Sequence, residues 1–119
     1  MREDCIFCKI VTGTIPSAHL AETDFAIAIR DLHPQAKQHF LVIPKIHATH
    51  LDELSQQTRG EELLGQLVGF AAALARKQGL MPEGYRLVAN TNPYGGQSVY
   101  HLHFHVLGGE PLAGQFGAG

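Results

Sequence analysis

The sequence predicts an α+β fold, an antiparallel sheet of about five strands with one long helix and a short N-terminal helix. Two patterns indicate this. Several short segments have the alternation or apolar runs of strands, whereas one long segment has apolar residues at helical three- and four-residue intervals. The 119 residues are 45% hydrophobic, which is enough for one domain with its own core. We therefore expect a single domain over residues 1–119, with a glycine-rich tail at 108–119.

Five segments have the pattern of strands. One alternates large apolar residues, Phe25, Ile27 and Ile29, with alanines, which suits a strand whose small residues face a neighbouring layer. Another is a short apolar run that Pro44 ends. The expected strands cover residues 18–22, 25–30, 39–43, 84–90 and 99–107. Three strands precede the long helix and two follow it, so an antiparallel sheet with this helix on one face is expected.

Two segments are expected to be helical. The long helix covers residues 59–78, where the apolar residues form a single stripe. Thr58 and Glu61 resemble a capping box before it, and Gly79 is a stop signal after it. Near the N-terminus, residues 5–11 form a short apolar turn or helix.

Charge and hydropathy exclude several classes of function. The chain has 9 Lys plus Arg, 11 Asp plus Glu and a net charge of -2, with no basic tract, which disfavours nucleic acid as a partner. The longest apolar stretch, residues 67–75, is far shorter than the roughly 20 residues that cross a bilayer, so no membrane span is expected. Charged residues stand at the N-terminus where a signal peptide would need an apolar core. We expect a cytoplasmic protein.

The only two cysteines are Cys5 and Cys8, at the spacing of a metal half-site. In a reducing compartment such a pair favours metal ligands or plain thiols over a structural disulfide. Two further ligands would complete a tetrahedral zinc site. Two buried thiols on a short helix are the alternative.

The segment 99–107 contains three histidines at alternate positions. Because successive side chains of a strand point to opposite faces, His101, His103 and His105 should share one face, and the apolar residues between them should face the core. Imidazoles this close together repel one another when protonated, which would lower their pKa values and keep a neutral, nucleophilic ring available near pH 7. A polar outer face of an edge strand, or an adventitious metal patch, is the alternative without function.

The sequence resembles the histidine triad (HIT) superfamily, and its Hint branch in particular. The central motif is His-x-His-x-His at residues 101–105, and the segment Gly95–Tyr100 before it is similar to the Hint pattern. The resemblance extends over nearly the whole chain. Further similar segments are residues 5–10, 15–17, 30–31, 34–36, 39–45, 84–86 and 107–109.

The resemblance implies a single HIT domain, a homodimer and a hydrolase that cleaves the P–N bond of purine nucleoside phosphoramidates, such as AMP or GMP joined to an amine. By this resemblance His103 is the nucleophile, forming a nucleotidyl-imidazole intermediate that water resolves, without a cofactor in the chemistry. His39, His101 and His105 would orient it and stabilise the phosphate. The chemistry agrees, because a neutral imidazole is a competent covalent catalyst when a hydrogen bond holds its second nitrogen.

The same resemblance implies a set of substrate contacts. Ser98 and Asn90 would contact the phosphate and leaving group, and Asp31 would hold the ribose hydroxyls. Gly96 and Gln97 belong to a segment expected to offer backbone N–H groups to the phosphate. The base would occupy an apolar slot formed by Ile6, Phe7, Leu32 and Leu41. Taken singly, several of these residues also have structural interpretations: a turn for Asp31, a strand end for Asn90, and core packing for Phe7 and Leu41.

For the cysteine pair, the resemblance is to bacterial HIT proteins that carry zinc. It implies that His47 and His101 join Cys5 and Cys8 in a Cys2His2 structural zinc site, with His50 as a rival ligand to His47. Many Hint proteins lack these cysteines, so the fold does not require the metal. His19 and His33 are assigned to the surface.

The chain also departs from the Hint pattern. His33 stands where a small hydroxyl residue is usual, Ile29 where an aromatic residue often frames the base, and Glu110 where Arg is usual, and the tail has no Trp. The base and leaving-group preferences therefore do not follow from the resemblance. Two other functions stay open: a dinucleoside polyphosphate hydrolase of a sister HIT branch, and a non-catalytic, zinc-stabilised nucleotide-binding or interaction module.

Overall fold

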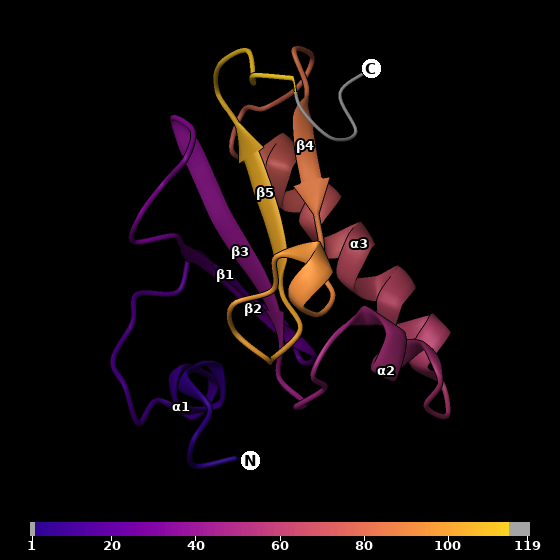
Figure 1. Cartoon of the computed structure of the whole chain (residues 1–119). Helices are drawn as coiled ribbons and strands as arrows, with labels where there is room; N and C mark the ends of the chain where they lie inside the picture. The colour runs from indigo at the N-terminus through magenta and orange to yellow at the C-terminus, as the bar shows by residue number, and fades with distance from the viewer. Residues whose placement is uncertain (1, 115–119) are drawn as a thin grey trace.

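A computed structural model describes residues 2–114, and it confirms the α+β fold with a five-stranded antiparallel sheet (Figure 1). The strand order is β1-β2-β3-β5-β4. The strands are β1 (Ala21–Glu22), β2 (Ala26–Arg30), β3 (Gln38–Pro44), β4 (Tyr85–Val88) and β5 (Phe104–Gly108). The helices are α1 (Ile6–Thr12), α2 (Leu51–Ser55), α3 (Gly60–Lys77) and a short 3-10 turn, η1 (Pro93–Gly95).

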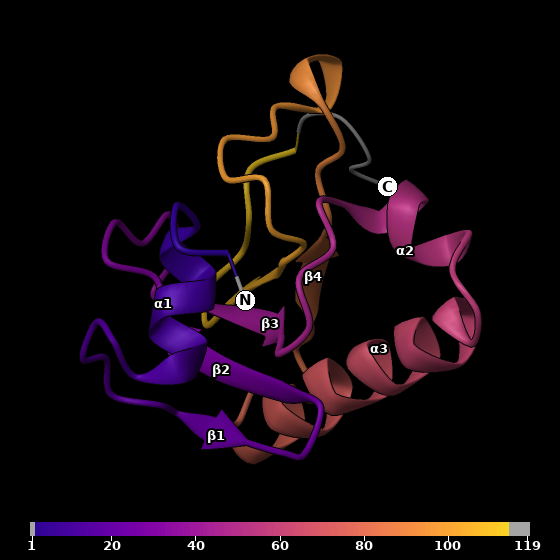
Figure 2. The ribbon, with the colours of Figure 1, turned by 90° about the horizontal axis from the view of Figure 1, so that it is seen from below.

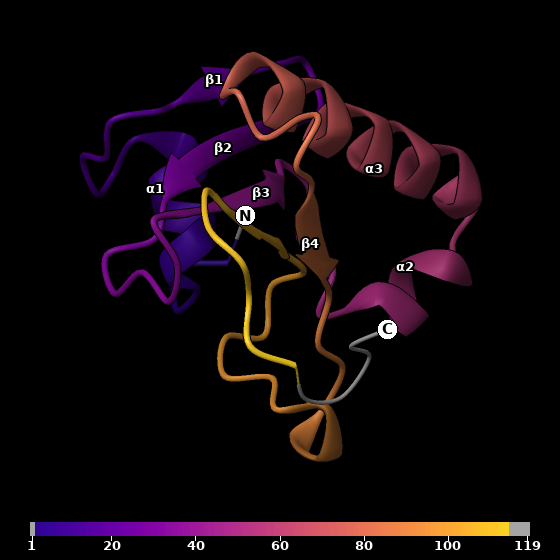
Figure 3. The same ribbon diagram turned by 90° about the horizontal axis from the view of Figure 1, so that it is seen from above.

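The sheet separates two apolar layers, and β2 shows how. Its alanines, Ala26 and Ala28, are fully buried in the core beneath α3, whereas Ile27 and Ile29 pack in a second cluster with residues of α1. The predicted alternation is therefore confirmed for these residues. Figure 3 shows α3 and α1 on opposite sides of the strands. Phe25 was expected beside the isoleucines, but it precedes β2 and its ring packs against Phe70 on the α3 side.

Helix α1 confirms the expected helical segment and places the cysteine pair at its first turn. Cys5 is the N-cap residue, and its Sγ accepts a hydrogen bond from the Cys8 backbone N–H at 3.3 Å. Gly13 ends the helix with a φ of 83°, a left-handed conformation that glycine adopts without strain.

Helix α3 confirms the predicted long helix, but the predicted capping box is wrong. The N-cap residue is Arg59, which has a φ of 62° and makes no side-chain cap. The reason is α2, a short helix that the sequence analysis did not identify and that leaves only a tight turn before α3. Gly60 lies so close to α2 that an added Cβ would approach the Leu54 carbonyl oxygen to 1.8 Å.

Strand β5 begins at Phe104, so the expectation that His101 and His103 lie within a strand is wrong. In the β3–β5 register, Val42 pairs with Phe104, which would set Pro44 opposite Leu102. Proline has no N–H to donate, so the ladder stops there. The Leu102 N–H bonds instead to the Ala48 carbonyl at 2.7 Å. The alternation of faces nevertheless persists, because Leu102 belongs to the core under α3 while both histidine rings contact Phe7 of α1.

The loop around η1 projects at the end of the molecule opposite β1 (Figures 2 and 3). The glycine-rich tail follows β5 without regular structure as far as residue 114, and its last five residues, 115–119, lie outside the described range. No helix within residues 2–114 combines the length and the hydropathy needed to span a membrane.

Candidate active site and metal cluster

The ring of His103 is held in one tautomer. Its Nδ1 lies 2.8 Å from the backbone carbonyl oxygen of His101. A carbonyl only accepts, so Nδ1 carries the hydrogen and Nε2 keeps a lone pair. The Phe7 ring packs edge-on against the imidazole with 5.0 Å between centroids, and only 8% of His103 is exposed. His103 therefore presents a fixed, unprotonated nitrogen, as a nucleophile requires.

His105 is oriented by a chain of hydrogen bonds from the neighbouring strand. The backbone N–H of Gln35 donates to Nδ1 of His39 at 3.1 Å, which leaves the His39 hydrogen on Nε2. This Nε2–H lies 2.9 Å from Nδ1 of His105 and 3.3 Å from Oδ2 of Asp31. Since His105 Nδ1 accepts, its own hydrogen is on Nε2. His105 is thus a donor beside the acceptor His103, with 5.0 Å between the ring centroids.

Asp31, His39 and His105 lie close enough together to suggest a metal trio, since one ligand atom from each falls within 4.8 Å of the others. The Gln35 contact argues against it. A metal on Nε2 of His39 would move the ring hydrogen to Nδ1, where it would face the Gln35 N–H donor. These three side chains are therefore a hydrogen-bond chain that fixes His105.

Burial lowers the pKa of both reacting rings. The pKa of His103 falls below its ordinary value because desolvation disfavours the charged ring. The pKa of His105 is lowered to about 4, mainly by desolvation and in smaller part by the neighbouring His103 and His39. The sequence analysis predicted this direction but named repulsion between histidines as the cause, whereas burial is the larger one.

Several predicted substrate contacts surround this pair. Asn90 lines a pocket of about 200 Å³ together with Gln35, His39 and His105. Asp31 accepts the His33 N–H at 2.8 Å through Oδ1, which is a turn contact, and its Oδ2 faces His39.

The four residues expected to form a slot for the base differ in exposure: two are buried and two are exposed. Phe7 and Leu41 are 7% and 6% exposed, in the cluster beneath α1. Ile6 is 49% exposed at the start of α1, and Leu32 is 89% exposed on the loop after β2. The chain therefore brings Phe7 to His103 but leaves Leu32 outside the buried cluster.

The glycine segment does not have the free backbone N–H groups that were expected to bind the phosphate. The N–H groups of Gly95, Gly96 and Gln97 bond back to carbonyls of Asn92 and Pro93 at 3.0 to 3.1 Å, so they are not free donors for a phosphate. Gly96 has a φ of 79° and closes the η1 turn. Ser98 is exposed on this segment.

The side chain of Gln97 is 8% exposed and has a role that the sequence analysis missed. Its Oε1 accepts the Asn92 N–H at 2.9 Å, and its Nε2 donates to the carbonyls of Thr49 at 2.7 Å and Val99 at 3.1 Å. The burial and bonding of this side chain could not be predicted from the glycine motif.

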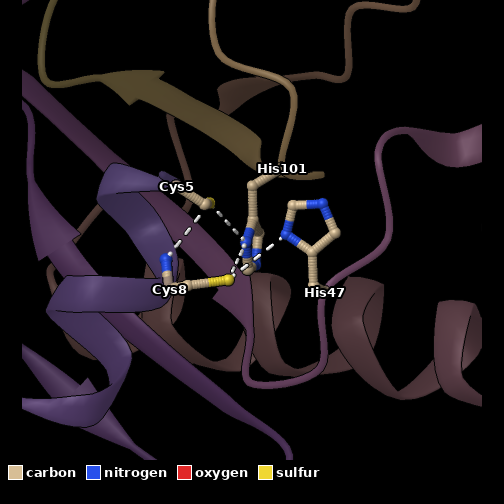
Figure 4. A group of neighbouring side chains, drawn as sticks. All are labelled: Cys5, Cys8, His47 and His101. Carbon is tan, nitrogen blue, oxygen red and sulfur yellow. Dashed lines mark hydrogen bonds between the residues drawn. The ribbon is translucent and has the colours of Figure 1, made fainter. Parts of the chain in front are cut away.

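The second cluster unites the four predicted metal ligands (Figure 4). His101 Nδ1 lies 3.3 Å from Cys5 Sγ and 3.4 Å from Cys8 Sγ, and His47 Nδ1 lies 3.2 Å from Cys8 Sγ. All four ligand atoms lie within 4.8 Å of one another. His50, the predicted rival, instead accepts the Glu53 N–H and caps α2.

The donor set of this cluster fits a tetrahedral zinc ion. His101 donates from Nε2 to the Pro44 carbonyl at 2.9 Å, so the lone pair of Nδ1 is the one that faces the sulfurs. Burial also lowers the pKa of His101 to about 4, which keeps this ring neutral. Both nitrogens of His101 are thus engaged away from the reacting pair, and its backbone carbonyl is what touches His103.

The remaining histidines have no part in either cluster. His19 pairs with Glu22 at 3.2 Å, and His33 is exposed.

Comparison with known proteins identifies the family. Residues 12–112 match the HIT domain family. The chain belongs to this family. It is 44% identical over 112 residues to a purine nucleoside phosphoramidase of Escherichia coli, covering 94% of this chain and 92% of the relative. A 14 kDa zinc-binding protein of Zea mays is 42% identical over 107 residues, covering 90% of this chain and 83% of that protein.

A solved structure gives the same result for the fold. A HIT family hydrolase of Legionella pneumophila superposes with a TM-score of 0.88 at 41% identity, over 98% of this chain and all of the other. The predicted superfamily is therefore confirmed, and the chain is a HIT family hydrolase with a cluster of four residues, two of them at its N-terminal helix, that could hold a metal ion.

Proposed function

We propose that this HIT hydrolase cleaves the P–N bond of purine nucleoside phosphoramidates through a nucleotidyl intermediate on His103. The observation that carries the proposal is the pairing of two fixed tautomers, a lone pair on His103 Nε2 beside a hydrogen on His105 Nε2. The name of the E. coli relative supports the substrate class.

The chemistry follows from these two rings. The His103 Nε2 lone pair attacks the α-phosphorus, a P–N(His) bond forms, the P–N bond to the amine breaks, and the departing nitrogen takes a proton from solvent. The hydrogen bond from Nδ1 to the His101 carbonyl stabilises the positive charge that develops on the ring. Water then attacks phosphorus, releases its proton to solvent and breaks the P–N(His) bond, which restores the neutral ring and releases the nucleoside monophosphate. His105 would donate to a phosphate oxygen, where charge gathers in both steps.

The proposal extends to the substrate contacts that the family resemblance implies. Asn90 lies at the pocket beside His105 and would contact the phosphate, and Ser98, which is exposed, would contact the leaving group. Asp31 would receive the ribose hydroxyls, because a carboxylate accepts from two donors. Phe7 and Leu41 would form the inner wall for the base, with Ile6 and Leu32 at its exposed rim. Gly96 and Gln97 would shape the loop that presents Ser98.

We also propose a structural zinc ion held by Cys5, Cys8, His47 and His101. It would tie α1 to the segment before β5, and the zinc-binding relative from Zea mays supports it. The metal supplies cross-linking only, since the ligand set is complete without water and the reacting rings lie outside it.

A homodimer in the cytoplasm completes the proposal. β4 lies at the edge of the sheet, which is where the sheet of a second copy could continue. Cys5 and Cys8 form no disulfide, which suits a reducing compartment. Sedimentation at micromolar concentration tests the dimer, since a monomer mass would contradict it.

Turnover of a fluorogenic adenosine phosphoramidate tests the function. We expect the wild type to release the amine and His103→Ala to be slower by at least about 10³-fold. Equal rates for the two proteins, or no rate above buffer for either, would refute the proposal. Turnover of a dinucleoside polyphosphate in place of the phosphoramidate would indicate the sister activity, and nucleotide binding without any turnover would indicate a binding module.

A further inference from the structure

Three backbone carbonyls accept hydrogen bonds from the segment 97–102, which directly precedes the nucleophile His103. The segment 44–49 starts at Pro44, the last residue of β3, and its carbonyls at Pro44, Ala48 and Thr49 accept hydrogen bonds from residues 97–102. Two of these bonds come from His101 Nε2 and the Leu102 N–H. The third, at 2.7 Å, comes from the side chain of Gln97. Gln97 is thus the anchor at the far end of the segment that contains His101.

The same side chain also holds the preceding loop. Asn92 has a φ of 61° and a ψ of -179°, a combination that is strained for a residue other than glycine. Gln97 Oε1 accepts the Asn92 N–H, and the Gln97 N–H donates to the Asn92 carbonyl at 3.1 Å. Both backbone polar groups of the strained residue are therefore bound by Gln97.

Every polar atom of the Gln97 amide has a partner, and all of those partners are backbone atoms. Its second Nε2 hydrogen bonds to the Val99 carbonyl at 3.1 Å. This bond fixes the direction in which the chain leaves the loop toward His101. The His101 carbonyl in turn receives the Nδ1–H of His103 at 2.8 Å.

We infer that Gln97 is a positioning residue for the nucleophile: its buried amide fixes segment 97–101, and through the His101 carbonyl it fixes the ring of His103. The inference rests on the proposed function only for its kinetic readout. It differs from a direct substrate contact, because no polar atom of this side chain is left for a ligand. Misplacing a reacting group by about 1 Å costs up to about 100-fold in rate.

Two variants distinguish the roles of the oxygen and the nitrogen of the Gln97 side-chain amide. Gln97→Met keeps the length of the side chain and removes all three bonds. Gln97→Glu keeps an oxygen for the Asn92 N–H but loses both donors to Thr49 and Val99. Leu74→Ala, in the core beneath α3, is the control for lost stability without a change at the site.

The first readout is the hydrolysis of the adenosine phosphoramidate, measured well below each melting temperature. We expect kcat to fall about 10-fold to 100-fold in Gln97→Met and by a similar factor in Gln97→Glu, with KM changed less than about threefold. Leu74→Ala should retain the wild-type kcat. Wild-type kcat in both Gln97 variants, or a loss confined to KM, would overturn the inference.

The second readout does not need turnover. The Nδ1–H of His103 can be followed by proton–nitrogen NMR of the imidazole, and its exchange with water measures how well the bond to the His101 carbonyl is held. We expect faster exchange in both Gln97 variants than in the wild type and Leu74→Ala. An unchanged exchange rate in the Gln97 variants would overturn the inference even if their kcat falls. If the wild type hydrolyses no phosphoramidate but the Gln97 variants still exchange faster than the wild type, the inference holds and only the proposed function is refuted.

Discussion

The molecule has two groups of histidines on the same side of its sheet. They differ in what their ring nitrogens face within residues 2–114. In the metal cluster of Cys5, Cys8, His47 and His101, the ligand atoms face one another. In the reacting pair, each ring has one nitrogen bonded within the protein, and no partner for Nε2 of either ring is present in residues 2–114. The first arrangement suits a structural site and the second suits a reaction.

The difference teaches that the position of a histidine in the motif does not decide its role. His101 and His103 are two residues apart, yet one is buried completely with both nitrogens engaged and the other retains an acceptor. The acceptor or donor character of the atoms opposite each ring sets its tautomer.

Removing a ligand of the metal cluster should affect stability most. We expect Cys8→Ser to bind less than one zinc per chain and to lose about 4 kcal/mol at free zinc about 1,000-fold above the wild-type Kd, which corresponds to roughly 10 to 20 °C in Tm. Calorimetry with and without chelator measures this. Chelator should lower the wild-type Tm to that of the variant and leave the variant unchanged. A wild-type Tm that ignores chelator would contradict a structural metal.

Removing the donor of the reacting pair should affect only catalysis. We expect His105→Ala to lower kcat about 100-fold, because a donor to charge developing on the phosphate is lost. His105→Gln, whose amide can donate in the position of Nε2, should recover part of the rate. Steady-state kinetics and zinc content decide the matter, and a variant that lost zinc together with activity would show that the two clusters are not separable.

Breaking the hydrogen-bond chain behind His105 should have a smaller effect. His39→Asn keeps an acceptor for the Gln35 N–H but has no hydrogen at the place of Nε2, so the tautomer of His105 is no longer fixed. We expect kcat to fall about 10-fold. His39→Gln places a donor near His105 and should fall less. If both variants had the wild-type kcat, the chain would have no role in orienting His105.

The sequence predicted the fold and the residues that come together in the two clusters. It did not predict the local structure that positions these residues. The alternation of His101, His103 and His105 with apolar residues correctly predicted which side they face. Strand β5 starts only at Phe104 because Pro44 would lie opposite Leu102, and the strand register that sets these two residues opposite one another cannot be seen in the sequence. The bond from Gln97 to the Thr49 carbonyl joins residues 48 apart in the sequence, and no local pattern indicates it.

The helical signals show the same limit. The long helix was predictable from its stripe of apolar residues, whereas the capping box at Thr58 failed because α2 leaves only a tight turn before Gly60. Helix α2 itself has a local signal. Glu53 lies three residues after His50, and the two are joined through the Glu53 N–H and the His50 ring.

The pH dependence of kcat/KM should sharpen the contrast by showing how burial sets the nucleophile. Burial lowers the pKa of His103 below its ordinary value of 6.5, so the ring stays neutral to a more acidic pH than an exposed histidine would. As the pH falls, activity should be lost with a midpoint below 6.5, where Nε2 becomes protonated. The acidic limb of kcat/KM reports this group in the free enzyme.

Substitution of Phe7 should shift the midpoint of the acidic limb of kcat/KM, because the Phe7 ring packs against His103 and excludes water from one side of it. In Phe7→Ala the imidazole is better solvated, the charged form costs less, and the midpoint should rise toward 6.5 by less than about one pH unit. Val11→Ala, which trims the same helix at its far end, should leave the midpoint unchanged. Because Phe7 also forms part of the proposed base slot, KM should rise as well, but a uniform loss of affinity scales the whole profile without shifting its midpoint. A midpoint that stays in place or moves to lower pH in Phe7→Ala would mean that charge, rather than burial, sets the pKa of the nucleophile.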